Sequence, residues 1–176
     1  DVDWLKLPSR IDSLTEEGSM KFNLDYEENE GFRRMASVAV IAPEVGRSDT
    51  LYIKQKGANV PTMQFQQSSQ QILGSASTVL ADLETNIALE DLTIDVLYTG
   101  GYTGEDWINN DFTIENNEFL KFSYLANPSE TALRNAKISL SYVDGWGDKI
   151  VSELFLTQAN ANDEFGERGT FTELRM

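Results

Sequence analysis

A short turn in the second half of the chain combines an indole ring with two carboxylates, Asp144-Gly145-Trp146-Gly147-Asp148. Glycines on both sides leave the indole little local cover, because glycine has no side chain to lie against it. An exposed indole can stack on the apolar C–H face of a sugar ring while aspartate oxygens accept hydrogen bonds from the sugar hydroxyls. Trp146, Asp144 and Asp148 are therefore candidate carbohydrate-binding residues.

A second aromatic ring could extend such a surface. Tyr102 lies in the glycine-rich segment 99–104, which reads TGGYTG, and it is a further candidate for stacking. Tyr98 instead continues an alternation of apolar residues, so we predict that it is buried. The segment has no lysine and no helix signal after it, so it is not a phosphate-binding loop.

This candidate site has structural alternatives. The Trp146 indole could fold back onto its own hairpin or against a neighbouring domain, which would leave it without a ligand. Asp144 and Asp148 could hold a calcium ion together with loop carbonyls. Their spacing matches no calcium-binding loop, however, and Asp-Gly pairs are ordinary in hairpin turns. We expect no metal and no cofactor.

The composition argues against catalysis and against anionic partners. The 176 residues include no histidine and no cysteine, which removes the usual general base, the thiolate nucleophile and the commonest metal ligand. The many carboxylates fall mostly on outward strand positions and in turns, where a solvated surface explains them. A net charge of −15 disfavours nucleic acid and anionic membranes as partners. No apolar run approaches the ~18 residues of a membrane-spanning helix. We expect a protein that is not an enzyme.

The turn belongs to a pattern that occurs twice. The stretch 120–158 repeats the stretch 22–55 in the spacing of its apolar and polar residues, with a tryptophan upstream of each. A repeat of domain length indicates two copies of one module. Recurrence is explained more simply by a shared core than by a shared ligand, so we predict structural roles for the recurring polar and aromatic residues. These pairs are Trp4 and Trp107, Arg34 and Arg134, and Gln55 and Gln158, while Asn29 and Asn127 recur as turn residues.

Short stretches of alternating apolar and polar residues, separated by Gly, Asn and Pro, predict an all-β fold. The most regular strands are expected at 33–41, 50–55, 119–125, 134–142 and 150–158. A hairpin is expected from 87–89 and 92–98, whereas 75–84 suits either a strand or a helical turn. We place a first module at residues 1–59, a second at 60–160, and a tail or the start of a following domain at 161–176.

The order of these elements resembles the BACON domain (Bacteroidetes-associated carbohydrate-binding often N-terminal). The shared features are a hydrophobic strand, an Asn turn, Arg-x-Ala-x-(Ile/Val)-x-(Leu/Val), and a strand that ends in Gln. The resemblance covers most of residues 4–57 and 60–160. It implies two tandem immunoglobulin-like β-sandwich modules, the first incomplete at its N-terminus, in an exported protein of a Bacteroidetes-type bacterium. The implied location is the periplasm or the outer-membrane surface, with a lipid anchor in the full-length protein.

Two functions are compatible with these features. The first is a non-catalytic spacer or scaffold, which needs only rigid modules, a short linker and an acidic surface. This function predicts that Trp146 is packed against its own sheet or the linker. The alternative is a carbohydrate-binding (glycan-binding) module, and this function predicts that Trp146 is exposed to solvent. The corresponding partners are another envelope protein or a polysaccharide.

The first module raises a question of its own. A seven-stranded sandwich takes about 100 residues, and residues 1–59 provide little more than half of that length. The inner apolar face of residues 20–56 therefore needs a cover, because large apolar patches are unusual on soluble monomers. Candidates are the second domain, a second molecule, or a strand from the alternating segment 169–176.

Overall fold

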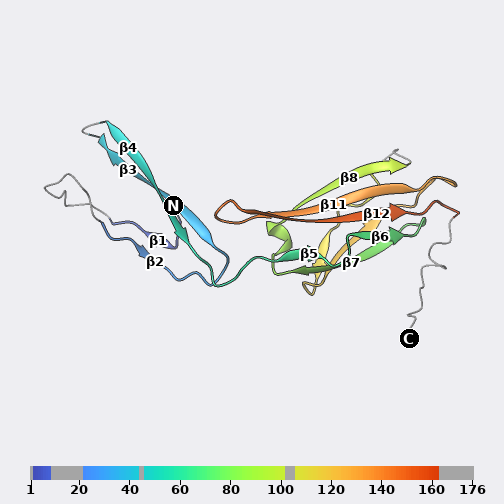
Figure 1. The fold of residues 1–176 in the computed structure, drawn as a ribbon, viewed down its shortest axis with the longest axis horizontal. Coiled ribbons are helices and arrows are strands. Elements are labelled where there is room, and N and C mark those ends of the chain that lie inside the picture. The colour runs from blue at the N-terminus through green and yellow to red at the C-terminus, as the bar shows by residue number, and fades with distance from the viewer. Residues whose placement is uncertain (1, 9–21, 44–45, 102–105, 163–176) are drawn as a thin grey trace. The chain divides into compact units, whose positions relative to one another are not determined.

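The computed structural model describes residues 2–8, 22–43, 46–101 and 106–162. These residues form β-strands joined by turns, with a short 3-10 turn at Leu89–Asp91 and no α-helix among them. The all-β prediction is therefore confirmed. The chain divides into two compact units (Figure 1). The first comprises Asp1–Val60 together with the turn Asp144–Asp148, and the second comprises Pro61–Val143 and Lys149–Met176.

In the part of the second unit that the structure describes, the strands form two four-stranded sheets. One contains, in spatial order, β5 (Met63–Phe65), β7 (Ser77–Thr85), β10 (Phe119–Tyr124) and β9 (Thr113–Glu115). The other contains β6 (Ser69–Ile72), β12 (Lys149–Gln158), β11 (Arg134–Val143) and β8 (Thr93–Gly101). Neighbouring strands are antiparallel except β6, which pairs with β12 in parallel. Since β5 and β6 are consecutive, the chain changes sheets between Phe65 and Ser69 (Figure 1).

Alternation along the strands builds the core of the second unit. Successive strand side chains point to opposite faces, so alternate residues are buried along β7, β10, β11 and the C-terminal half of β12. The two sheets contribute these residues to a sandwich-like interior: Val79, Ala81, Leu83, Leu120, Phe122 and Tyr124 from one, and Ala136, Ile138, Leu140, Leu154 and Leu156 from the other. Burial of this aliphatic and aromatic surface is the main driving force for folding the unit.

Two of the local predictions are settled by this arrangement. The ambiguous segment 75–84 is the strand β7, whose alternate residues are buried. The hairpin predicted at 87–89 and 92–98 is wrong, because only its second arm is a strand. The Thr85 hydroxyl accepts a hydrogen bond from the Ile87 amide (3.1 Å), and the backbone then enters the 3-10 turn. Ile87 is buried without being in a strand, which explains why its apolar character suggested one.

The described residues of the first unit form two small sheets. β1 (Leu5–Lys6) pairs with β2 (Asp25–Tyr26), and the longer β3 (Arg34–Ala42) pairs with β4 (Arg47–Gln55), both antiparallel (Figure 1). Between them lies a small cluster in which Leu24 and Ile53 pack against the buried residues Trp4, Leu5, Ala36 and Val38.

A polar network in the second unit connects the ends of its strands. Arg134 and Gln158 lie opposite each other in the β11–β12 ladder, and the Arg134 Nε donates to the Gln158 side-chain oxygen. Arg134 Nη2 and Gln158 Nε2 both donate to the Leu125 carbonyl, at 2.6 and 2.9 Å. The Arg134 guanidinium also lies 4.8 Å from the centre of the buried Trp107 ring. These contacts satisfy groups that would be costly to bury unpaired.

The first unit contains the same network. Arg34 and Gln55 lie opposite each other in the β3–β4 ladder, and Arg34 Nε donates to Gln55 Oε1 at 2.7 Å. Both side chains donate to the Glu27 carbonyl, at 2.9 and 2.7 Å. The Arg34 guanidinium lies 4.5 Å from the centre of the Trp4 ring. The structural roles predicted for the recurring tryptophans, arginines and glutamines are confirmed by these contacts.

The recurring asparagines complete the correspondence. Asn29 donates from its amide to the Phe32 and Lys56 carbonyls, and its side-chain oxygen accepts from the Gly31 amide. Asn127 is nearly inaccessible to solvent and makes the same three types of contact, with Ala132, Ala159 and Ser129. Each asparagine therefore ties the turn after one strand to the end of the closing strand.

Candidate functional site

Asp144 organises the turn that the sequence singled out. Its carboxylate accepts hydrogen bonds from the backbone amides of Trp146 (2.8 Å) and Asp148 (3.1 Å). The Asp144 backbone bonds to Asp148 and Gly147, which closes the turn. The Asp144 side chain is almost completely buried. It therefore functions as a local cap for backbone amides.

The two glycines of the turn have different structural tasks. Gly147 has φ +89°, a conformation that side-chain-bearing residues rarely adopt. A Cβ on Gly145 would lie 2.6 Å from the Arg33 carbonyl oxygen and 2.7 Å from the Arg34 Cα, so only glycine permits this backbone approach. Gly147 is thus needed for the turn geometry and Gly145 for the close approach of the Arg33–Arg34 backbone, and neither reason depends on exposure of the indole.

Arg33 binds both aspartates. Its Nε donates to Asp144 and its Nη2 donates to Asp148, and the same guanidinium forms ion pairs with both carboxylates. Burial alone would raise the pKa of Asp144, but the bonds from Arg33 and from the two turn amides outweigh it and hold that pKa below its ordinary value. Hydrogen bonding to Asp144 is the main cause of the raised pKa of Arg33. Within the described ranges, no group of three or more acidic side chains could hold a metal ion.

Trp146 is half-buried and makes specific contacts. Its indole nitrogen donates to the Arg34 carbonyl at 3.1 Å. The Arg33 guanidinium carbon lies 4.9 Å from the centre of its ring, and the Lys54 ammonium lies 5.3 Å from it. Both cations are within the range of cation–π attraction. The ring is therefore surrounded by cations of the first unit.

The structure brings together three of the four candidate site residues. Trp146, Asp144 and Asp148 share the turn, while Tyr102 lies outside the described residues. Sequence reasoning missed Arg33 and Lys54, because more than ninety positions separate each of them from Trp146 and no local pattern links them. Tyr98, predicted to be buried, is half-buried. It packs on Trp107 with ring centres 5.9 Å apart, and its hydroxyl accepts from the Ile108 amide.

Acid is expected to weaken the first unit through Asp144. The folded state holds the pKa of Asp144 below the ordinary value of 3.8, so the unfolded chain takes up the proton first as the pH falls. The stabilisation is thus complete above that value and is lost as the pH falls through the folded pKa. An Asp144→Asn variant should be less stable near neutral pH and should lose part of the pH dependence between about pH 5 and pH 2. Urea denaturation monitored by the NMR signals of β3 and β4 measures both effects. Identical pH profiles for the two proteins would contradict this assignment.

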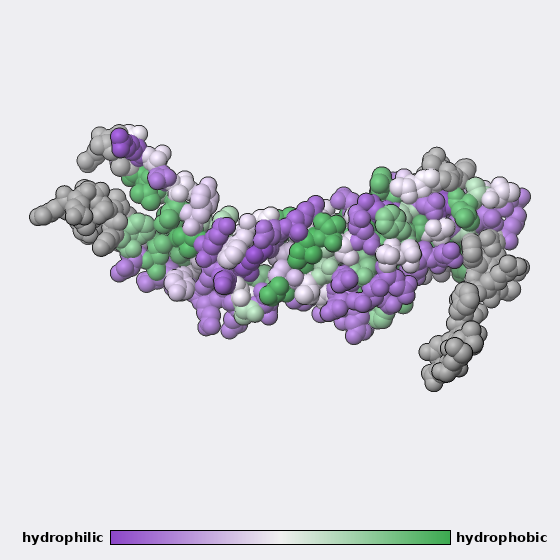
Figure 2. Space-filling model, in the orientation of Figure 1, coloured by the Kyte–Doolittle hydropathy of each residue, from purple (hydrophilic) through white to green (hydrophobic). Residues whose placement is uncertain are grey.

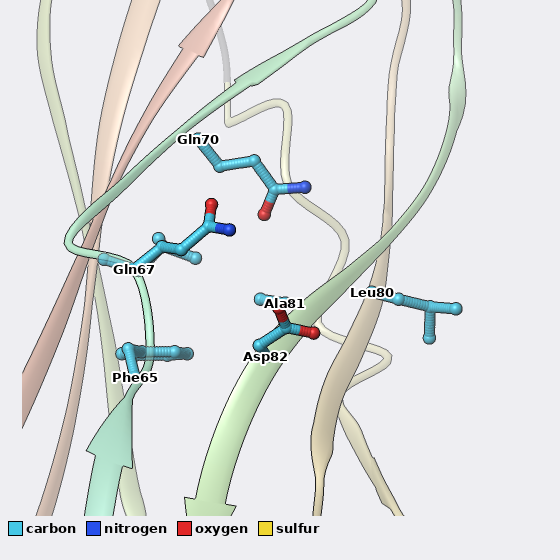
Figure 3. Close-up of a pocket in the computed structure, with 7 residues that line it drawn as sticks. Phe65, Gln67, Gln70, Leu80, Ala81 and Asp82 are labelled. Atoms are coloured by element: carbon cyan, nitrogen blue, oxygen red, sulfur yellow. The ribbon is translucent and has the colours of Figure 1, made fainter. Parts of the chain in front are cut away.

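A separate hollow lies in the second unit, where the chain changes sheets between β5 and β6. Its volume is about 60 Å³, and it is lined by Phe65, Gln67, Gln70, Leu80, Ala81, Asp82 and Leu154. Figure 3 shows the side-chain amides of Gln67 and Gln70 extending into the same space, with Asp82 across from them. Drug-sized ligands occupy pockets of about 300–1,000 Å³. This hollow has room for water molecules and is no binding cleft for a ligand of that size.

Comparison with known proteins assigns no family to the chain. No protein-family model matches the chain, and no curated protein matches it. Among solved structures, the chain is similar to a variant of an endo-fucoidan hydrolase from glycoside hydrolase family 107, with 12% identity and a TM-score of 0.33 over 91% of this chain. The unsubstituted endo-fucoidan hydrolase gives 11% identity and a TM-score of 0.31 over 78% of this chain. The chain spans about a fifth of the length of these structures, 22% and 20%.

Proposed function

We propose that the chain is a non-catalytic pair of immunoglobulin-like modules that serves as a spacer or scaffold in an exported protein of the bacterial envelope. The sheet order of the second unit supports the module type. An immunoglobulin constant-type sandwich has strands A-B-E-D in one sheet and C-F-G in the other. The orders β5-β7-β10-β9 and β8-β11-β12 correspond to these, with β6 as an additional edge strand beside β12.

The recurring polar network supports the tandem arrangement. In each unit an arginine and a glutamine lie opposite each other at the ends of two paired strands and donate to one carbonyl, and the arginine covers a tryptophan. The same residues carry the resemblance to the BACON domain. Export and attachment at the envelope are proposed on that resemblance. No helix in the described part of the chain is long and apolar enough to cross a membrane.

The observation that carries the spacer function is that the candidate ligand-binding groups are already bonded to other groups of the protein. Asp144 is occupied by Arg33 and by two turn amides, and the Trp146 nitrogen is occupied by a backbone carbonyl. Cations lie over the Trp146 ring, where a sugar would have to stack. Groups bound in this way stabilise the protein itself, and a ligand would have to displace those contacts at a cost in binding free energy.

Glycan binding remains the second candidate, because one part of the site is open. The Asp148 side chain is 70% exposed beside the half-buried Trp146 ring. A carboxylate next to an aromatic edge can accept hydrogen bonds from sugar hydroxyls. In this function the exposed part of Trp146 and Asp148 would form one small contact surface for a polysaccharide.

A glycan array separates the two functions. For the spacer, we expect neither the full chain nor its Trp146→Ala variant to bind any polysaccharide above background. Binding by the full chain that is lost in Trp146→Ala, and reduced in Asp148→Asn, would overturn the spacer and establish the glycan-binding module. Tyr52→Ala is the matched control, because Tyr52 is another exposed aromatic residue of the first unit.

A further inference from the structure

The first unit exposes side chains whose counterparts in the second unit are buried. Tyr26 is 68% exposed, while Tyr124, its counterpart in the repeat, is 3% exposed. Leu51 is 42% exposed, while its counterpart Leu154 is 1% exposed. Hydrophobic surface is visible on the first unit around β1, β2 and the β3–β4 hairpin (Figure 2). An apolar face of this kind on a soluble protein marks a contact surface.

The second unit shows which elements cover the equivalent face. There β7 pairs with β10, β8 pairs with the outer edge of β11, and β6 pairs in parallel with the outer edge of β12. In the described part of the first unit, the corresponding strands β2, β3 and β4 form only two-stranded sheets. Their outer edges therefore present backbone donors and acceptors as well as apolar side chains. Such edges accept additional strands.

The strand registers are the same in the two units, which defines the geometry of the missing cover. Leu5 lies opposite Tyr26 as Ile108 lies opposite Tyr124. The Glu27 amide donates to the Trp4 carbonyl at 2.9 Å, as the Leu125 amide donates to the Trp107 carbonyl at 2.8 Å. A cover for the first unit thus needs one antiparallel strand against β3, one antiparallel strand against β2 and one short parallel strand against β4.

We propose that the first unit is a strand-accepting surface, covered in the full-length polypeptide by strands that lie ahead of Trp4 in the same chain. This rests on the proposed pair of modules. In the second unit all the covering strands, β5 to β8, precede Trp107. A matching order in the first unit places its covering strands before Trp4, with the same alternation of apolar residues that β8 shows at Ile94, Val96 and Tyr98.

A second copy of the chain is the less suitable cover. The net charge of −15 opposes self-association. The strands of a second copy that carry the required pattern, β7 and β8, are already paired within its own second unit. A segment of the same polypeptide also has a high effective concentration at the surface that it covers.

Amide hydrogen exchange on the full 176-residue chain tests the proposal first. We expect the outward-pointing amides of β3 and β4 to exchange at least about 10-fold faster than those of β11 and β12, because the outer edges of β3 and β4 lack partners. Equal protection in a monomer would show that the surface is already covered, which overturns the proposal. Protection of β3 and β4 only in a dimer, detected by light scattering, would identify a second copy as the cover and would also overturn it.

An added segment tests the second step. A copy of 61–103 is joined to Asp1, so that Trp4 follows the copied strands at the spacing at which Trp107 follows the originals. We expect exchange in β3 and β4 to slow by about 10-fold or more. In the matched control, the copied Ile94 and Val96 are both replaced by aspartate, and no slowing is expected. Unchanged exchange with the intact copy would overturn the proposal. Fast exchange of the backbone amides in β11 and β12 would instead show that the proposed module fold itself is wrong.

Discussion

Replacing Gln158 by leucine is expected to lower the free energy of unfolding of the second unit by about 3–5 kcal/mol. Gln158 is fully buried, and its side-chain nitrogen donates to the Gly74 and Leu125 carbonyls at 3.2 and 2.9 Å. Its oxygen accepts from Arg134. Leucine has a similar volume but no polar atom, so these partners lose a hydrogen bond to a side chain that is fully buried. Each such loss costs about 1–3 kcal/mol. Urea denaturation monitored by NMR signals of β11 and β12 measures the change.

Gln55→Leu is the matched control, because Gln55 holds the same position in the first unit. Gln55 is only half-buried, and its bond to the Glu27 carbonyl is exposed. Water can replace the lost hydrogen bonds there, so we expect a loss of about 1 kcal/mol or less. The two variants disrupt equivalent networks, of which the one at Gln158 is buried and the one at Gln55 is partly exposed. An equal loss in both would mean that burial of the network does not determine its contribution.

The strands and the recurring network are the parts of the fold that could be predicted from sequence. Alternation is a local signal, and it located β3, β10, β11 and β12 to within one or two residues. Recurrence is an internal comparison, and it predicts the structural roles that Trp107, Arg134 and Gln158 have in the folded unit. The error at Ile87 has a local cause, since a buried residue in a turn has the same apolar character as one in a strand.

The surroundings of the turn at Trp146 could not be predicted in this way. The composition of the turn leaves open whether the ring is exposed or packed, because nothing nearby in the sequence supplies a cation. The guanidinium of Arg33 and the ammonium of Lys54 come from distant parts of the chain. Long-range ion pairs depend on tertiary structure, and one sequence carries no signal for them. The steric reason for Gly145 is also a tertiary contact, with the backbone of Arg33 and Arg34.

Trp107→Ala is expected to be the second most damaging substitution, with a loss of about 3–5 kcal/mol from the second unit. The Trp107 side chain is 1% exposed. Its ring centre lies 5.9 Å from that of Tyr98 and 6.4 Å from that of Tyr124, and the Arg134 guanidinium covers it. Alanine would leave a cavity and would remove both aromatic contacts together with the cation–π contact. Trp107→Phe keeps a ring in the core and should cost less. Guanidinium denaturation with NMR detection measures the loss.

Trp4→Ala is the companion variant, and comparing the two connects stability with the proposed cover. Trp4 contacts Arg34 as Trp107 contacts Arg134, but the first unit has only a small cluster around it. Fewer neighbours leave a smaller cavity, which the remaining side chains and water can fill, so we expect a loss of about 2 kcal/mol or less. With the copied segment 61–103 joined to Asp1, the loss at Trp4 should rise toward that at Trp107, because the added strands would enclose the cavity. A loss at Trp4 as large as that at Trp107 without the added segment would show that the first unit already has a complete core.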